Sequence, residues 1–95
     1  MYARVVRARF APDRLDEAIQ LWQEAVAPTA QQQPGFKNAR LLVQRETGQV
    51  MSIGLWETEA DFQTSVAWNA AQLAKFAALF ATPPVVDHYE LAAEV

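Results

Sequence analysis

Cysteine is absent from this sequence of 95 residues. Without it the chain can form no disulfide, no thiolate metal site and no cysteine nucleophile. A single histidine adds no ligand spacing, so we expect no bound metal. The sequence also lacks a charged segment followed by an apolar run at its start, and no apolar stretch approaches the roughly 18 residues that span a bilayer. We therefore expect a cytoplasmic protein with no membrane contact.

Excess positive charge is also missing. Eight Lys and Arg against eleven Asp and Glu give a net charge of −3, and the basic residues are scattered along the chain. Binding to nucleic acid requires a basic surface, so nucleic acid is not an expected partner. The sequence contains no nucleophile elbow, phosphate-binding loop, dinucleotide-binding glycine pattern or H-E-x-x-H zinc motif.

Large apolar residues, by contrast, are abundant. The composition is 52% hydrophobic, with three Trp and five Phe. A chain of this length forms one domain, here residues 1–95, and such a domain buries only roughly 65% of its unfolded surface. The apolar content exceeds what a small monomer easily hides, which indicates an interface with another chain.

Four segments have strand-like composition: 2–10, 36–45, 50–57 and 85–91. Two helical regions separate them. The first is predicted to begin at an Asp13 cap and to be kinked by Pro28. The second is predicted to begin at a Thr58 cap and to run, with a break, to about residue 81. Gly48 lies between the second and third strands, where a hairpin turn requires a positive φ angle.

The order strand–helix–strand–strand–helix–strand predicts an α+β, ferredoxin-like fold with a four-stranded antiparallel sheet and both helical regions on one face. The second strand presents Ala39, Leu41 and Val43 on one side and Phe36 and Leu42 on the other. Because helices cover only one face, we expect the second apolar face to meet a twofold-related copy in a homodimer.

His88 is the residue best suited to acid–base chemistry. Imidazole titrates near neutral pH, and Glu90 shares its face of the last strand, so His88 could be an oriented general base. A histidine at the strand surface or in an interface is the simpler interpretation.

Trp56 and Ser52 share one face of the third strand with Gly54, and these small groups beside an indole leave space for a ligand. The wider aromatic set could line a pocket for a flat apolar molecule or could form the core; its members are Trp22, Trp56, Phe62, Trp68, Phe76, Phe80 and Tyr89. Asn69 either contributes to the pocket or caps the helix that follows it.

Several short motifs resemble the antibiotic biosynthesis monooxygenase (ABM) domain family of the dimeric α/β barrel superfamily. They are Pro34-Gly35-Phe36, Leu41-Leu42, Gly48, Leu55-Trp56-Glu57-Thr58 and the strand from Val85 to Glu90, and they extend over nearly the whole chain. The resemblance implies a dimeric barrel with a pocket between the sheet and the helices of each subunit. Members include cofactor-free monooxygenases, quinol oxygenases and haem-degrading oxygenases.

The resemblance also implies positions for functional residues. The haem-degrading members use an Asn, a Trp and a His where this chain has Val6, Ser65 and Lys75, which disfavours haem degradation. The cofactor-free monooxygenases use a strand Trp, which Trp56 matches, together with an Asn, a Tyr and a later Arg. Ser52 and Phe62 occupy the Asn and Tyr positions, and the Arg position falls at 75 or 76.

The resemblance thus implies a cofactor-independent monooxygenase that lets the anion of an aromatic or quinol-like substrate react directly with oxygen. Trp56 would form a wall, Ser52 would donate a hydrogen bond, and His88 or an ordered water would take the proton. The residues expected to contact substrate are Trp22, Phe62, Trp68, Asn69, Phe76 and Tyr89. The alternative is a non-catalytic dimeric barrel that binds a hydrophobic small molecule.

Overall fold

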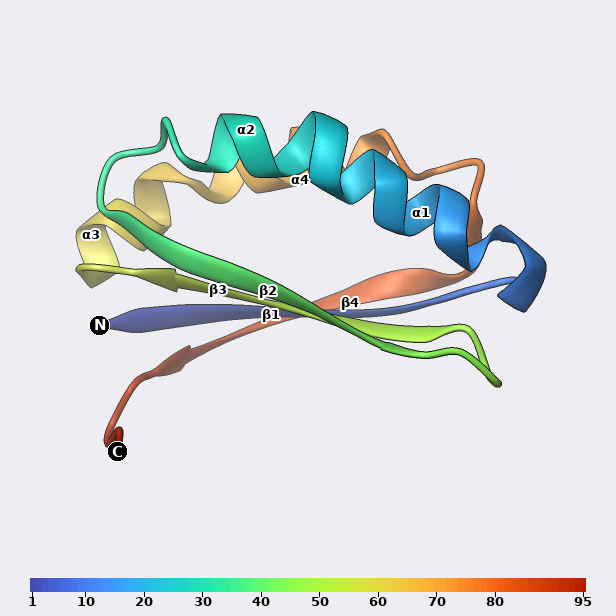
Figure 1. The fold of residues 1–95 in the computed structure, drawn as a ribbon. Coiled ribbons are helices and arrows are strands. Elements are labelled where there is room, and N and C mark those ends of the chain that lie inside the picture. The colour runs from blue at the N-terminus through green and yellow to red at the C-terminus, as the bar shows by residue number, and fades with distance from the viewer.

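The computed structural model describes residues 1–95 as four strands and a layer of helices (Figure 1). The strands are β1 (Tyr2–Phe10), β2 (Phe36–Gln44), β3 (Gln49–Trp56) and β4 (Phe80–Glu90). The first helical region contains a 3₁₀ turn (Pro12–Arg14), α1 (Leu15–Leu21), a π-helical segment (Trp22–Val26) and α2 (Ala27–Ala30). The second contains α3 (Glu59–Thr64) and α4 (Val66–Ala74).

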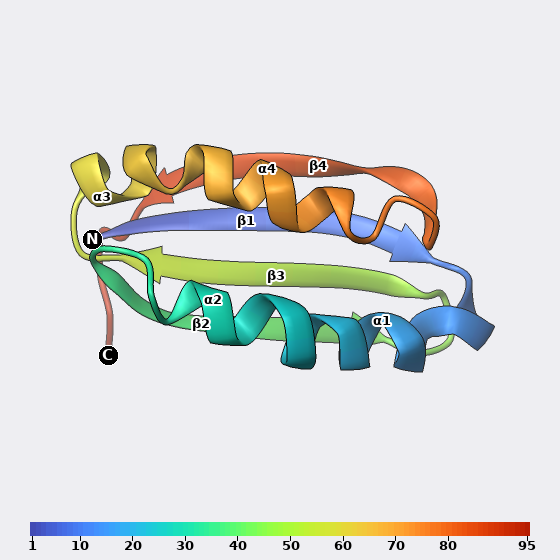
Figure 2. The ribbon, with the colours of Figure 1, turned by 90° about the horizontal axis from the view of Figure 1, so that it is seen from above.

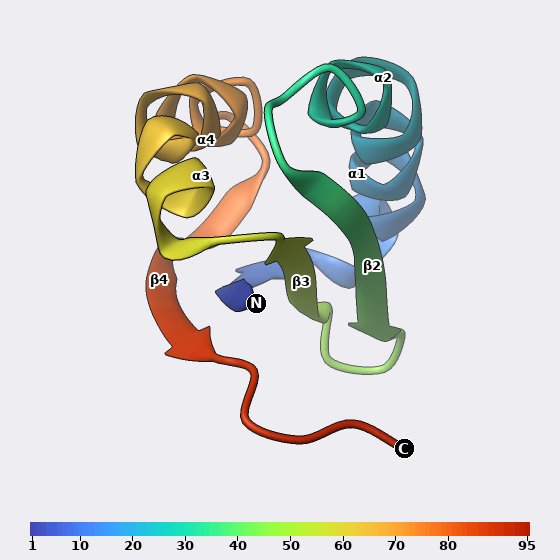
Figure 3. The ribbon, with the colours of Figure 1, turned by 90° about the vertical axis from the view of Figure 1, so that its left-hand side faces the viewer.

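The sheet has the strand order β2-β3-β1-β4, and every neighbouring pair is antiparallel. With the helical connections after β1 and β3, this is the ferredoxin-like α+β fold that the sequence predicts. The helices all lie on one face of the sheet, as the end-on view shows (Figure 3). Seen from above, α1 and α2 run over the β2 side of the sheet and α4 runs over the β1 and β4 side (Figure 2).

Two local predictions are confirmed in detail. Thr58 caps α3, because its side chain accepts a hydrogen bond of 3.1 Å from the backbone N–H of Asp61. Gly48 has a φ of 79°, as the hairpin turn requires. A Cβ atom at this position would lie 1.9 Å from the carbonyl oxygen of Phe10, so only glycine fits the turn.

Three boundaries differ from the prediction. Asp13 lies inside the 3₁₀ turn and caps nothing; α1 begins at Leu15 without a side-chain cap. Asn69 lies in the middle of α4, which begins at Val66, so it is not a cap. β4 begins at Phe80, before the two prolines rather than after them. The prolines are tolerated because β4 is an edge strand and its pairing with β1 shifts register between Arg7 and Arg9.

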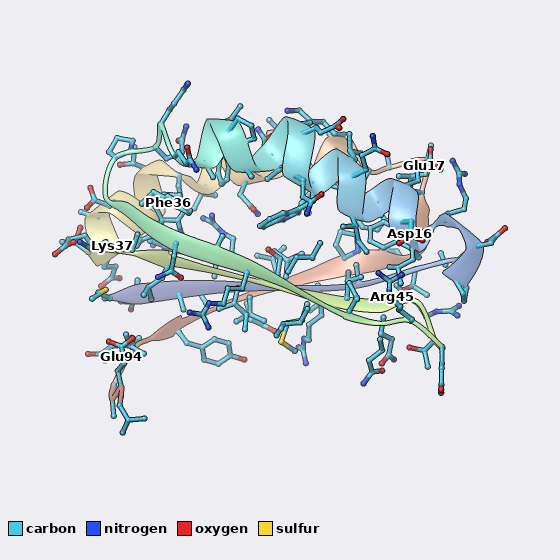
Figure 4. The ribbon with its side chains drawn as sticks, viewed as in Figure 1. Asp16, Glu17, Phe36, Lys37, Arg45 and Glu94 are labelled. Carbon is cyan, nitrogen blue, oxygen red and sulfur yellow. The ribbon has the colours of Figure 1, made fainter.

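Phe36 also differs from the prediction, because it lies on the helix side of the sheet. A register shift between Phe36 and Asn38 places Phe36 opposite Trp56. The alternation that assigns Phe36 to the Leu42 face fails at this irregularity. Figure 4 shows Phe36 between β2 and the helical layer.

The face of the sheet away from the helices carries exposed apolar side chains. Leu42, Val85 and Tyr89 are each about half exposed there. No helix covers this face (Figure 3). It is the face on which the sequence predicts a second copy. No helix in the structure is both long and apolar enough to cross a lipid bilayer.

Candidate functional site: a cavity between sheet and helices

A cavity of about 580 Å³ lies between the sheet and the helices, and most of the residues that line it are hydrophobic. Its size falls in the range of pockets that hold small molecules. The walls include the aromatic residues Phe10, Trp22, Phe36, Trp56, Trp68, Phe76 and Phe80.

The floor of the cavity exists because small residues meet in the sheet. In the strand register, Ala39, Gly54, Arg4 and His88 form one row across β2, β3, β1 and β4. Ala39 and Gly54 carry too little side chain to fill the space under the helices. The cavity therefore extends over them, and Arg4 borders it on the β1 side.

The roof consists of two helical regions held together by few polar contacts. The indole Nε1 of Trp68 in α4 donates to Thr29 Oγ1 in α2 at 3.1 Å. Lys75 Nζ donates to the Ala25 carbonyl at 3.2 Å and to Gln72 Oε1 at 2.7 Å. Ala25 belongs to the π-helical segment just before Pro28, and π-helical turns inside helices are frequent at functional sites.

Trp56 is almost fully buried, at 1% exposure, at the end of the cavity nearest Phe36. Its Nε1 is the one buried side-chain polar atom without a hydrogen-bond partner in the protein. An unpaired buried donor of this kind costs about 1–3 kcal/mol. Ser52 also lines the floor of the cavity.

Arg4 is the charged group most deeply buried at the site, at 4% exposure. Its Nη2 donates to Ser65 Oγ at 2.9 Å and to the Phe62 carbonyl at 3.5 Å. Burial lowers the pKa of the Arg4 guanidinium from its ordinary value to about 10, so it is charged at neutral pH.

The predicted site residues separate into two groups. Trp56, Ser52, Trp22, Trp68, Asn69 and Phe76 all line the cavity. Tyr89 does not, because it pairs with Ala3 on the opposite face of the sheet. Phe62 and His88 lie beside the cavity rather than in its lining, and their rings pack together with centroids 5.2 Å apart. The His88 ring also stacks on Tyr2 near the sheet edge.

Arg4 is the functional candidate that the sequence analysis did not single out. Three arginines lie among apolar residues in β1, at positions 4, 7 and 9, and they look alike in the sequence. Strand periodicity separates them, because Arg4 shares its face with Val6 and Phe10 whereas Arg7 and Arg9 face the other way. The structure contains no group of three or more His, Asp or Glu side chains arranged to hold a metal ion.

Comparisons with known proteins agree with this fold. The family model described as antibiotic biosynthesis monooxygenase matches residues 1–81. A crystal structure of a monooxygenase from the ActVA-Orf6 gene of Streptomyces coelicolor, in complex with nanaomycin D, superposes with a TM-score of 0.82 at 17% identity, covering 99% of this chain and 89% of that one.

Two further structures share the fold. A protein of unknown function from Nitrosomonas europaea, NE2512, has a TM-score of 0.80 at 23% identity, covering 99% of this chain and 91% of its own. A point mutant of SnoaB, a cofactor-independent oxygenase from Streptomyces nogalater, has a TM-score of 0.75 at 18% identity, covering 99% of this chain and 95% of its own. No curated protein sequence matches the chain significantly.

Proposed function

Because the chain belongs to the antibiotic biosynthesis monooxygenase family, we propose that it is a cofactor-independent monooxygenase acting on an aromatic or quinol-like small molecule. The observation that carries the proposal is the cavity of about 580 Å³ with its aromatic walls. Flat aromatic molecules pack well against such walls, and the few polar groups orient them.

The reaction proposed is the oxidation of an activated aromatic carbon by molecular oxygen. An anthrone serves as the example: its carbanion transfers an electron to O₂, and the two radicals combine into a peroxide anion. A proton returned from water converts this anion into the hydroperoxide, and loss of water leaves a carbonyl. One oxygen atom enters the product and the other leaves as water, so the substrate supplies all the electrons. The protein contributes by binding the anion and stabilising its charge.

The proton in this scheme passes to water. No Asp, Glu, His or Tyr side chain lines the cavity, and His88 lies outside it. Of the two proton acceptors that the sequence analysis leaves open, water is therefore the one we propose. A substrate whose own acidity is high enough to ionise near neutral pH suits this site best.

Trp56 and Ser52 are the residues proposed to contact the reacting part of the substrate. The Trp56 Nε1–H, which has no partner within the protein, and the Ser52 hydroxyl are proposed to donate hydrogen bonds to an anionic oxygen of the substrate. Trp22, Trp68, Phe76 and Asn69 are proposed to hold the rest of the molecule.

Oxygen uptake tests the proposal. The purified protein is mixed with a panel of anthrones and hydroquinols at pH values either side of neutral, and oxygen consumption above the spontaneous rate is expected for at least one of them. Trp56→Phe keeps an aromatic ring, although a smaller one, and removes the donor, and we expect kcat/KM to fall about tenfold or more. Val66→Ala, at an exposed position of α4, is the matched control. Uptake no faster than without protein, across the whole panel, would overturn the proposal.

A non-catalytic binding protein is the second candidate, and one observation favours it. The cavity lining lacks any carboxylate, imidazole or phenol that could act as a general base. This candidate predicts tight binding of the same aromatic molecules with no oxygen uptake.

A further inference from the structure

Arg4 is a buried cation without a negative partner. Its side chain is 4% exposed, and its hydrogen-bond acceptors, Ser65 Oγ and the Phe62 carbonyl, are both neutral. The guanidinium also lies 4.6 Å from the centre of the Phe62 ring. All four salt bridges in the structure use other basic residues, namely Arg7, Arg14, Lys37 and Arg45. A buried charge without a counter-ion is unfavourable, so a bound anion would stabilise it.

Some N–H donors of the Arg4 guanidinium have no acceptor within the protein. A guanidinium carries five N–H donors, and the hydrogen bonds within the protein engage only Nη2. Nε and Nη1 have no acceptor within the protein, and neither is a fully enclosed atom. Arg4 lines the cavity, and these two nitrogens are the donors that it has left for a ligand there.

A second unpaired donor lies next to Arg4. Gly54 is the direct neighbour of Arg4 across the β1–β3 ladder. The Trp56 indole nitrogen lies over Gly54, 3.7 Å from the point that a Cβ atom would occupy, and the Arg4 guanidinium is 5.6 Å from the centre of the Trp56 ring. One end of an aromatic cavity thus combines a positive charge and free N–H donors with no negative charge.

We propose that this end of the cavity is an anion subsite, in which the Arg4 guanidinium binds the carboxylate or phenolate oxygen of a flat aromatic ligand beside the Trp56 indole. This inference rests on the proposed function, which makes the cavity the substrate site, and it adds that the substrate is negatively charged. A planar guanidinium matches such oxygens because it donates two parallel hydrogen bonds. Its positive charge also favours the ionised form of a bound phenol.

Isothermal titration calorimetry at neutral pH tests the subsite with two matched probes, anthracene-9-carboxylate and the neutral anthracene-9-carboxamide. The wild-type protein is expected to bind the carboxylate about tenfold or more tightly than the amide. Arg4→Gln is expected to remove this preference while changing amide affinity by less than about threefold. Arg9→Gln removes the same charge from the exposed face of the same strand and is expected to leave both affinities unchanged.

Two milder variants keep the test decisive even if Arg4→Gln fails to fold. Arg4→Lys keeps the charge but loses the planar fork, so an intermediate carboxylate preference is expected. Gly54→Ala adds a methyl group at ordinary contact distance from the Trp56 nitrogen, so the fold is expected to survive while carboxylate affinity falls. Equal wild-type affinity for the two probes, or an undiminished preference in the Arg4→Lys and Gly54→Ala proteins, would overturn the inference.

The outcome is separable from that of the proposed function, because binding is measured without turnover. A protein that binds the carboxylate through Arg4 but consumes no oxygen overturns the proposed function alone. A protein that consumes oxygen but shows no preference for the carboxylate overturns the subsite alone.

Discussion

Arg4 Nη2 donates a 2.9 Å hydrogen bond to Ser65 Oγ across a sequence separation of 61 residues. Ser65 is 1% exposed, and its hydroxyl in turn donates to the Phe62 carbonyl at 2.7 Å. Because Ser65 lies between α3 and α4, this chain of hydrogen bonds fixes the buried cation to the break in the helical layer. The position of Arg4 in the cavity therefore depends on a serine in a different layer.

Replacing Ser65 with alanine tests this connection. The variant removes both hydrogen bonds of the buried hydroxyl and leaves the guanidinium with the weaker 3.5 Å contact to the Phe62 carbonyl. We expect the free energy of unfolding to fall by about 1–3 kcal/mol, measured by urea denaturation followed by circular dichroism. Thr64→Ala removes the neighbouring exposed hydroxyl, and its effect is expected to stay within about 0.5 kcal/mol. Equal stabilities of the two variants would contradict the role of Ser65.

Glycines 48 and 54 are expected to respond differently to alanine. Gly48 has a positive φ and no room beside the Phe10 carbonyl, so Gly48→Ala should lower the free energy of unfolding by about 1–3 kcal/mol. Gly54 has ordinary strand geometry, and a Cβ atom there would make only an ordinary van der Waals contact with the Trp56 nitrogen. Gly54→Ala should therefore leave the thermal midpoint nearly unchanged. Thermal unfolding of both proteins measures the contrast. A Gly48→Ala protein as stable as the wild type would show that the turn is not held as described.

The ion pair between Lys37 and Glu57 predicts a pH dependence. The hydrogen bond from Lys37 holds the pKa of the Glu57 carboxyl below its ordinary value of 4.5. The unfolded chain therefore binds this proton more readily than the folded one, and the stabilisation is present above pH 4.5 and is lost as the pH falls through the folded-state pKa. In Lys37→Met the pKa of Glu57 should return toward 4.5, as measured by carboxyl ¹³C NMR titration.

The control for this titration is Arg45→Met. It breaks the exposed pair between Arg45 and Asp16, which Figure 4 shows side by side at the other end of the molecule. The pKa of Glu57 should be unaffected there. A Glu57 titration that is identical in the wild type and in Lys37→Met would refute the assigned cause.

The exposed apolar face of the sheet predicts a homodimer. Burying Leu42 in an interface contributes about 1.5–3 kcal/mol per copy to the free energy of dimerisation. Both copies lose this contribution in the variant, because a twofold axis places Leu42 of each copy in the interface. Leu42→Asp should therefore weaken dimerisation about 100-fold or more in sedimentation equilibrium. Val66→Asp places the same charge at an exposed apolar residue of the helical layer, and it should leave the dimer intact. A wild-type protein that sediments as a monomer would contradict the prediction.

Local sequence signals predicted the parts of the fold that local chemistry determines. The Thr58 cap and the Gly48 turn each depend on a few adjacent residues, and both are confirmed. The strand and helix order followed from the same kind of signal. Phe36 could not be assigned to the correct face, because the irregularity before Asn38 is a property of the pairing with β3 and has no signature in β2 alone.

Only part of the candidate site can be predicted from the sequence, for a related reason. Trp56, Ser52 and Gly54 share a face by simple alternation, and all three line the cavity. The importance of Arg4 depends on Ser65 and Gly54, which are distant in sequence and meet it only in the folded chain. His88 and Tyr89 had suggestive chemistry, but register places His88 beyond Arg4 at the sheet edge and Tyr89 on the opposite face.

A crystal structure of the protein with anthracene-9-carboxylate is the most direct test of the cavity as a binding site with an anion subsite at Arg4. We expect the ring system in the cavity between the sheet and the helices, with its carboxylate within about 3 Å of Arg4 guanidinium nitrogens. An empty cavity at saturating ligand, a ligand bound on the exposed face of the sheet, or a carboxylate directed away from Arg4 would contradict it.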